Sequence, residues 1–335
     1  MRKAAWVMAL CLLLCGCAGR VELSLMAIAL GIDADETGVT LTVKAPDYSA
    51  AARGEEGQKE YLTLSAHGED WTQAAARLMR EAPLEIRFGQ LREVVVGQGA
   101  RERHLLAELL GWADRLPNVR SHALVILCPG EARDLVEGQQ PVIGKRLSKY
   151  LDIALSHIEA EGRIPATALS CAVRDLSGPW RSPLLAWTEG GAYALGSRQN
   201  GLLTAEQVQL FRLITGESQQ YRLQGMGCSL RGRAHLAVEA ENGQDTLLLR
   251  LPVTLTYSVY ENPPAPGAED LLQQQVAALL DRLQALGCDA LGFGCMAVRR
   301  YGTLAAWLQS GWPERFCQAR VSVTVEAKYR QEAER

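Results

Sequence analysis

The chain has 335 residues, of which 48% are hydrophobic, and a formal net charge of −3. This length predicts two or three domains with enough apolar residues for their cores. No basic stripe accumulates along the sequence, so we expect no nucleic-acid partner.

Residues 1–16 have the pattern of an export signal peptide. Arg2 and Lys3 precede an apolar run from Ala4 to Leu14, which as a helix reaches roughly 16 Å, about half the thickness of a bilayer core. This run therefore cannot span a membrane unaided. No later segment approaches the roughly 18 uninterrupted apolar residues that a spanning helix needs.

The end of this run, LCGC at residues 14–17, resembles the bacterial lipobox, in which Leu, a tolerant position and a small residue precede an obligatory Cys. The resemblance implies that Cys17 is the lipidation site, carries a diacylglyceryl group on its sulfur and begins the mature chain. Cys15 occupies the tolerant position and leaves with the signal. The alternatives are an ordinary export signal that contains cysteine and a redox pair. The redox pair is disfavoured because the spacing is C-x-C inside an apolar segment.

Six further cysteines follow Cys17, and their spacings match neither a zinc site nor a haem motif. Two interpretations stay open: small buried thiols, which we favour, and disulfides, which an exported chain permits. Cys288 and Cys295 are the first pair to test for a bridge. The six are Cys128, Cys171, Cys228, Cys288, Cys295 and Cys317.

Residues 17–140 are typical of an amino-terminal α/β domain. Leu25 to Ile32 is nearly continuous apolar sequence, as in a strand covered on both faces, and "DADETG" at residues 33–38 predicts a turn into an alternating strand. Strand patterns at residues 60–68, 94–96 and 121–128 are interleaved with helical patterns. We therefore expect a mixed sheet with helices packed on it.

Residues 141–190 are typical of a small helical middle region, in which "SGPWRSP" at residues 177–183 is the best candidate for a linker or for the edge of a small domain. Residues 191–335 predict a carboxyl-terminal α+β domain. It contains a helix that begins with a capping box of Thr204 and Gln207, long strands, and an amphipathic helix from Ala268 to Leu286 that ends at Gly287. The chain as a whole predicts an α+β, multi-domain fold with mixed β-sheets flanked by helices and a strand-rich carboxyl-terminal domain.

Four segments resemble one known family. "ELSLMAIALGIDADE", "RFGQLREVVVG" and "LPNVRSHALVILCPGEARDLVEG" are similar to the amino-terminal region of the Ger(x)C family. "CDALGFGCMAVRRYGTLAAWLQSGWPERF" is similar to its carboxyl-terminal domain, with an Asp-x-x-Gly-Phe-Gly motif, a basic-aromatic stretch and two tryptophans. The residues at those positions are Asp289, Gly292, Phe293, Gly294, Arg299, Trp307, Trp312 and Phe316.

Because of two departures from the family pattern, the sequence resembles a divergent member. Ala18-Gly19 stand where relatives often carry Trp-Asp, and Gln90 stands where they often carry His. We interpret the carboxyl-terminal motif as an interface or a structural motif. Its aromatic residues with Arg299 predict either an exposed ligand surface or, as we favour, a packed core.

Members of this family are lipoprotein C subunits of bacterial spore nutrient-germinant receptors. The resemblance implies a lipid-anchored, non-enzymatic subunit that is required for nutrient-triggered germination. It would lie on the outer face of the cell membrane, which in the spore is the inner membrane. The implied partners are an A-type subunit with membrane-spanning helices and a B-type subunit that resembles amino-acid transporters.

Catalytic motifs are missing from the sequence. It contains no Gly-x-Ser-x-Gly, Ser-x-x-Lys or His-Glu-x-x-His pattern and no P-loop, and its five histidines are scattered. We therefore expect no enzyme activity, cofactor or metal site. The alternative function is a solute-binding lipoprotein of an uptake transporter, but such proteins have two similar lobes, and the sequence shows no such similarity.

Overall fold

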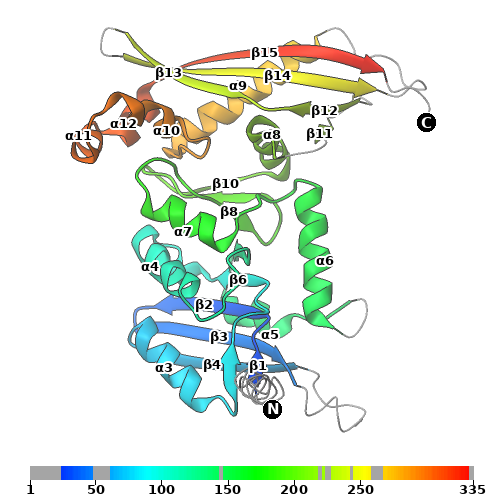
Figure 1. Cartoon of the computed structure of the whole chain (residues 1–335), viewed down its shortest axis with the longest axis vertical. Helices are drawn as coiled ribbons and strands as arrows, with labels where there is room; N and C mark the ends of the chain where they lie inside the picture. The colour runs from blue at the N-terminus through cyan, green and yellow to red at the C-terminus, as the bar shows by residue number, and fades with distance from the viewer. Residues whose placement is uncertain are drawn as a thin grey trace, which may run out of the picture.

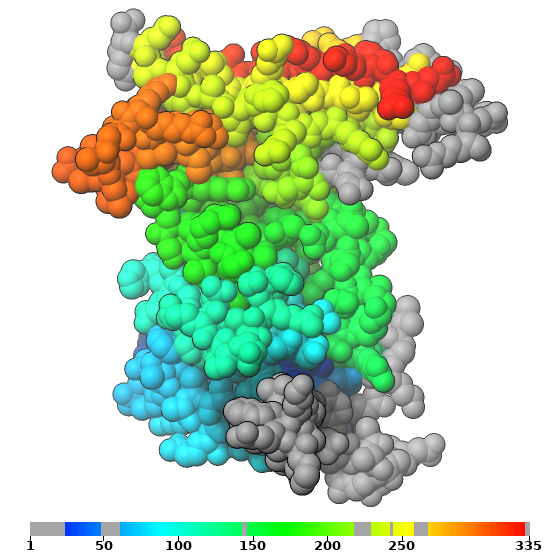
Figure 2. All heavy atoms as spheres, in the orientation of Figure 1, coloured from blue at the N-terminus to red at the C-terminus, as the bar shows by residue number. Residues whose placement is uncertain are grey.

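The computed structural model describes residues 24–47, 61–142, 146–217, 221–222, 228–241, 244–257 and 267–331. Two large β-sheets with their helices follow one another along the long axis (Figure 1). The molecule is broadest at the carboxyl-terminal sheet (Figure 2). These features confirm the predicted α+β class, with mixed sheets flanked by helices and a strand-rich carboxyl-terminal region. The predicted signal peptide and Cys17 lie outside the described residues.

The larger sheet has eight strands in the order β10-β9-β8-β7-β6-β2-β3-β4. Its centre, β2, β6, β7 and β8, is parallel, and antiparallel hairpins extend both edges. The strands are β2 (Ala29–Asp35), β3 (Gly38–Pro46), β4 (Tyr61–Gly68), β6 (Glu93–Val96), β7 (Leu124–Leu127), β8 (Leu184–Trp187), β9 (Ala192–Ala194) and β10 (Gly201–Leu203).

The apolar run from Leu25 to Ile32 is two strands and not the single strand expected. β1 (Ser24–Met26) pairs in parallel with β5 (Glu85–Arg87), apart from the large sheet. The backbone then changes partner: Ala27 N donates to the Arg87 carbonyl, and Ile28 N to the Lys44 carbonyl, both at 2.8 Å. The hairpin of β2 and β3 that follows is as predicted.

Helices cover both faces of the large sheet. Val94 and Val96 pack into the core shared with α3, α4 and α7, whereas Val95 packs against Ala132 and Val136 of α5. Adjacent side chains of a strand point to opposite faces, so α5 lies on the other side, as does α6, which packs on β7. The helices are α3 (Trp71–Glu81), α4 (Arg103–Asp114), α5 (Ala132–Gly138), α6 (Leu147–Ala160) and α7 (Leu169–Ser177).

The acidic residues of the β2–β3 turn hold the backbone. Asp35 Oδ1 accepts hydrogen bonds from Thr37 N at 2.7 Å and Gly38 N at 3.2 Å. Asp33 reaches a different element, because its two oxygens accept from Ala132 N at 2.6 Å and Arg133 N at 2.9 Å at the start of α5. In the described part of the chain, no group of three His, Cys, Asp or Glu side chains is arranged to hold a metal ion.

The carboxyl-terminal sheet is built around the long strand β14. β12 and β13 pair antiparallel with successive parts of β14, and β15 pairs with it in parallel from Thr246 to Tyr257. Alternate leucines of β14 pack against α9, whose predicted apolar face is buried. The elements are β11 (Tyr221–Arg222), β12 (Cys228–Gly232), β13 (His235–Glu241), β14 (Gln244–Tyr257), β15 (Arg320–Gln331) and α9 (Ala268–Leu286).

The large sheet crosses both domain boundaries expected from the sequence. β8 pairs with β7 although residues 141–190 were expected to be helical, and β9, from the expected carboxyl-terminal domain, pairs with β8. Next comes α8 (Ala205–Thr215), with the predicted capping box of Thr204 and Gln207. It packs in the carboxyl-terminal core together with Leu203 of β10. Within the described ranges, no helix has the length and apolarity needed to cross a membrane.

Candidate functional site

The Asp-x-x-Gly-Phe-Gly motif forms a tight turn between α9 and α10 (Phe293–Ala297), and the carboxylate of Asp289 lies at its centre. Oδ1 of Asp289 accepts from Gly292 N at 3.0 Å and from Phe293 N at 2.9 Å. Oδ2 accepts from Gly294 N at 2.6 Å and from Trp312 Nε1 at 3.0 Å. Four donors therefore satisfy a side chain that is only 5% exposed.

Burial has the largest effect on the pKa values of Asp289 and Cys288 in this turn. It raises the pKa of Asp289 above its ordinary value, although the hydrogen bonds from Gly294 and Trp312 oppose the change. Burial also raises the pKa of the Cys288 thiol to about 12. Cys288 and Cys295, the pair singled out for a possible bridge, are free thiols. Both thiols are therefore poor nucleophiles.

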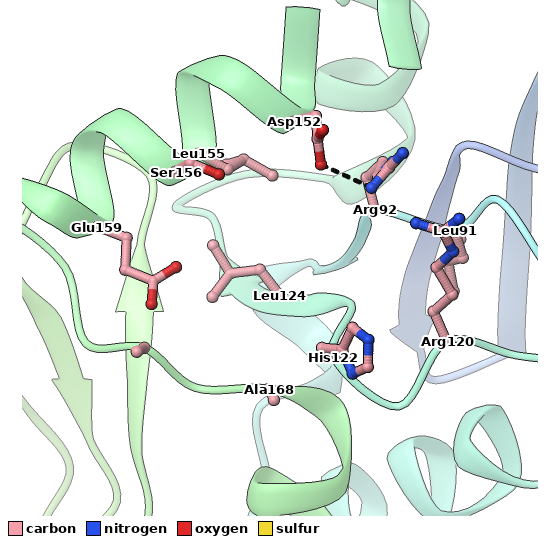
Figure 3. Close-up of a pocket in the computed structure, with 11 residues that line it drawn as sticks. Leu91, Arg92, Arg120, His122, Leu124, Asp152, Leu155, Ser156, Glu159 and Ala168 are labelled. Atoms are coloured by element: carbon pink, nitrogen blue, oxygen red, sulfur yellow. Dashed lines mark hydrogen bonds and ion pairs between the residues drawn. The ribbon is translucent and has the colours of Figure 1, made fainter. Parts of the chain in front are cut away.

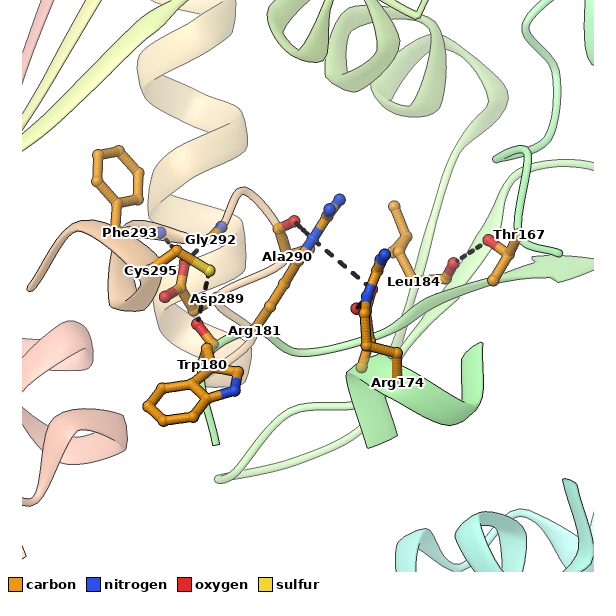
Figure 4. Close-up of polar contacts among 11 residues, drawn as sticks. Thr167, Arg174, Trp180, Arg181, Leu184, Asp289, Ala290, Gly292, Phe293 and Cys295 are labelled. Atoms are coloured by element: carbon orange, nitrogen blue, oxygen red, sulfur yellow. Dashed lines mark hydrogen bonds and ion pairs between the residues drawn. The ribbon is translucent and has the colours of Figure 1, made fainter. Parts of the chain in front are cut away.

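Residues 178–182, within the segment expected to be a linker or the edge of a small domain, dock on this turn (Figure 4). Ser182 N donates to the Asp289 carbonyl at 3.0 Å, and Arg181 Nε donates to the Ala290 carbonyl at 2.6 Å. The Cys295 thiol contacts the Trp180 carbonyl at 3.8 Å. The Gly-Pro pattern signals an irregular backbone, and this backbone is fixed by partners more than 100 residues away in the chain.

Glycine is required at two positions of the motif for different reasons. Gly292 has a φ of +83°, in the left-handed region that side chains disfavour. At Gly294 a Cβ atom would lie 2.5 Å from the Trp180 carbonyl oxygen and 2.8 Å from Trp312 Nε1. The first glycine permits the turn, and the second permits the close approach of residues 178–182.

The aromatic residues of the motif form a packed cluster. Trp307, in α11 (Leu304–Gln309), has its ring centroid 5.7 Å from that of Trp312 and 6.1 Å from that of Trp180. Trp307 Nε1 donates to the Pro179 carbonyl at 3.3 Å. Phe293 and Phe316 complete the cluster, Phe316 lying in α12 (Trp312–Gln318). Phe293, Trp307 and Trp312 are all buried, as in a packed core.

Arg299 lies apart from this cluster. It is exposed, on the short turn η3 (Val298–Arg300) that precedes α11. The structure therefore brings together seven of the eight predicted motif residues and leaves Arg299 at the surface. Trp180 also belongs to this cluster, and Arg181 binds the neighbouring turn through the Ala290 carbonyl. Sequence reasoning missed both residues because a local pattern does not reveal a distant partner.

A pocket of about 310 Å³ opens beside the aromatic cluster. Trp180, Trp307 and Trp312 form its apolar wall, and Arg103, the first residue of α4, also lines it. Helices from both halves of the chain therefore contribute to one concave surface. Pockets of this kind, apolar with a few polar groups, are where ligands and partner side chains bind.

A second pocket, of about 210 Å³, lies between α6 and the large sheet (Figure 3). Arg92 Nη1 forms an ion pair with Asp152 Oδ1 at 2.6 Å, and Arg120 Nε donates to the Gly89 carbonyl at 2.8 Å. Both guanidinium groups are thus engaged within the domain. We interpret this pocket as part of the packing of α6 on the sheet.

Comparisons with known proteins agree with the fold and with the position of the motif. Residues 21–189 match the family described as "Spore germination protein N-terminal domain", and residues 266–332 match "Spore germination B3/GerAC like, C-terminal". The solved structure titled "Crystal Structure of the GerBC protein" superposes with a TM-score of 0.52 at 15% identity, covering 91% of this chain and 98% of that chain. No curated protein matches the chain. The first match covers half of the chain and the second contains the Asp289 turn, so the chain belongs to the Ger(x)C family of spore germination proteins.

Proposed function

We propose that this protein is the lipid-anchored, non-enzymatic C subunit of a spore nutrient-germinant receptor, required for nutrient-triggered germination. One observation carries the proposal. The segment that matches the germination family begins at Val21, four residues after the lipobox cysteine Cys17. In a membrane-tethered subunit of this family, we expect the family domain to follow the lipidation motif closely in the sequence, as it does here.

The anchor would consist of the diacylglyceryl group on Cys17. Two acyl chains at about 0.8 kcal/mol per buried CH₂ make detachment from a bilayer rare. The anchor would hold the domains on the outer face of the cell membrane, which in the spore is the inner membrane. Confinement to that plane raises the effective concentration of the domains near A-type and B-type receptor subunits.

The chemistry of the Asp289 turn supports a role without catalysis. A catalytic carboxylate needs an oxygen free to reach a substrate, whereas both oxygens of Asp289 accept backbone or indole hydrogen bonds. The neighbouring Cys288 thiol is buried, with a pKa of about 12. These groups serve to fasten α10, α12 and residues 178–182 together.

Paired substitutions of the two signal cysteines test the anchor. Cys17→Ser removes the acceptor thiol, and Cys15→Ser is the matched control because it changes a cysteine two residues away in the tolerant position. We expect Cys17→Ser to leave the membrane fraction or to stay unprocessed, and Cys15→Ser to be processed and retained. Retention and processing of Cys17→Ser at the level of the parent protein would contradict the anchor.

A further inference from the structure

The outer face of α11 is apolar and exposed. Leu304 and Leu308 are 54% and 59% exposed, one helical turn apart, while Trp307 between them is 1% exposed and points inward. We call Leu304 and Leu308 the α11 ridge. Single exposed leucines are ordinary, but two on one face beside an apolar pocket are a feature of interaction surfaces.

The ridge is continuous with the pocket beside the aromatic cluster. Leu308 lines this pocket together with Trp180, Trp307, Trp312 and Pro313. Its volume of about 310 Å³ lies at the lower end of the range for ligand pockets, roughly 300–1,000 Å³. A pocket of this size accepts a large apolar side chain, and the ridge extends the contact beyond it along α11.

The rim of this surface is basic. Arg103 lines the pocket, and its hydrogen bond is a long one, 3.4 Å from Nη1 to the Leu195 carbonyl. No carboxylate in the described part of the chain forms an ion pair with it. Arg299 and Arg300, both exposed, directly precede the ridge. An occupant with carboxylates beside its apolar groups would complement these charges.

Two other occupants fit less well. A second copy of the chain on the same surface would bring these arginines against their own counterparts. A lipid surface is disfavoured by the position of the tether, an argument that rests on the proposed function. The strand β1, which begins seven residues after Cys17, lies toward the opposite end of the long axis from α11 (Figure 1). Seven residues span at most about 25 Å.

We propose that the α11 ridge and the adjoining pocket dock a segment of a different protein. This segment places an apolar side chain in the pocket beside the tryptophans, lies along Leu304 and Leu308, and presents carboxylates to Arg103 and to Arg299 or Arg300. The aromatic residues of the family motif then form the wall of the site, and the surface-exposed residues of α11 determine its partner.

Photo-crosslinking of the full chain in spores tests this proposal. Benzoylphenylalanine replaces Leu308 in one variant and, as a matched control, Ile153, which is 57% exposed on α6, in another. The expected adduct forms at position 308 and not at 153, and mass spectrometry places it in an apolar segment of another protein with Asp or Glu within about one helical turn. The proposal is overturned if the adduct forms with lipid, with a second copy of the chain, or with a segment that lacks carboxylates. Equal labelling at positions 308 and 153 overturns it as well.

Charge reversal tests the carboxylate contact. Arg103→Glu should lower the yield of the position 308 adduct at least tenfold, and Lys in place of the partner carboxylate should restore it. Arg80→Glu, at an exposed position of α3, is the control and should leave the yield unchanged. An unchanged yield of the position 308 adduct in Arg103→Glu overturns the proposal. Loss of this adduct when free amino acids or sugars are added also overturns it.

A surface variant provides a readout in germination. The double variant Leu304→Ser with Leu308→Ser changes only exposed side chains, so we expect its melting temperature and its amount in the membrane to equal those of the parent protein. We expect nutrient-triggered germination to be at least tenfold slower. Ile153→Ser should germinate like the parent. Normal germination of the double variant overturns the docking role. Failure of the lipid anchor would instead appear as retention of Cys17→Ser, so the two failures are distinguishable.

Discussion

Trp312 Nε1 donates a hydrogen bond to Asp289 Oδ2 at 3.0 Å, and this contact joins α12 to the turn that follows α9. The same oxygen accepts from Gly294 N at 2.6 Å. The outer surface of the turn receives Ser182 and Arg181 from the amino-terminal part of the chain. One carboxylate thus organises the contact between the two halves of the molecule, which makes it a sensitive place to test their coupling.

Asp289→Asn should destabilise the protein strongly. The asparagine side chain has one acceptor oxygen where aspartate has two. Its NH₂ group would therefore face the N–H groups of Gly294 and Trp312, and these two donors would lose their acceptor. We expect the free energy of unfolding to fall by about 2–4 kcal/mol. Denaturant unfolding measures this effect, with Asp134→Asn, an exposed aspartate of α5, as the control. Equal stability of the two variants would show that the four hydrogen bonds contribute little.

Gly294→Ala tests the close approach of residues 178–182. The added methyl group would lie 2.5 Å from the Trp180 carbonyl oxygen, so the segment must move. Overpacking of this kind costs about 1–3 kcal/mol in the free energy of unfolding. Gly302→Ala is the matched control, because no atom lies within 4 Å of its added Cβ. Similar melting temperatures for both alanine variants would mean that the docking of residues 178–182 is loose.

A buried polar cluster between β6 and α5 gives the amino-terminal domain a pH dependence. Glu93 is 2% exposed and accepts a hydrogen bond from Gln139 Nε2. Lys44, from β3, donates from Nζ to the carbonyls of Val136 at 2.9 Å and Glu137 at 3.0 Å. Burial raises the pKa of Glu93 to about 7, although the hydrogen bond from Gln139 and the charge of Lys44 both lower it.

Glu93→Gln should reduce the loss of stability with rising pH. Between pH 4.5 and 7 folded Glu93 keeps a proton that the unfolded chain has lost, so the stability of the parent protein falls as pH rises through this window. The difference in unfolding free energy between variant and parent should change by up to about 3 kcal/mol across it. Denaturant unfolding at a series of pH values measures this, with Glu69→Gln at an exposed position as the control. Parallel pH profiles for Glu93→Gln and the parent would place the ionisation of Glu93 in its ordinary range.

Elements with strong local signals were predicted correctly from the sequence. The helix from Ala268 to Leu286 buries the expected apolar face and ends at Gly287 in the left-handed conformation. α8 has the expected capping box, and "DADETG" forms the expected hairpin turn. In each case residues within one or two turns of each other determine the structure, so a single sequence contains the information.

Elements defined by distant partners were not predictable in this way. The short strand β8 lies in a region with helical pattern, and it is a strand because β7 pairs with it from about 60 residues earlier. Residues 178–182 resemble a linker because they begin with Gly178 and Pro179, yet distant carbonyls fix them. Within the candidate site, the family motif identified Asp289 and the tryptophans, but no local pattern could place Arg103 beside Trp307 in one pocket.

Nutrient-triggered germination of spores is the measurement that tests the central claim most directly. Spores of a deletion strain are complemented with the parent chain, Cys15→Ser or Cys17→Ser, and germination is followed over the nutrients to which the parent strain responds. We expect the deletion to abolish the response to at least one nutrient, the parent chain and Cys15→Ser to restore it, and Cys17→Ser to fail. Deletion spores that germinate at the parent rate with every nutrient would contradict the account.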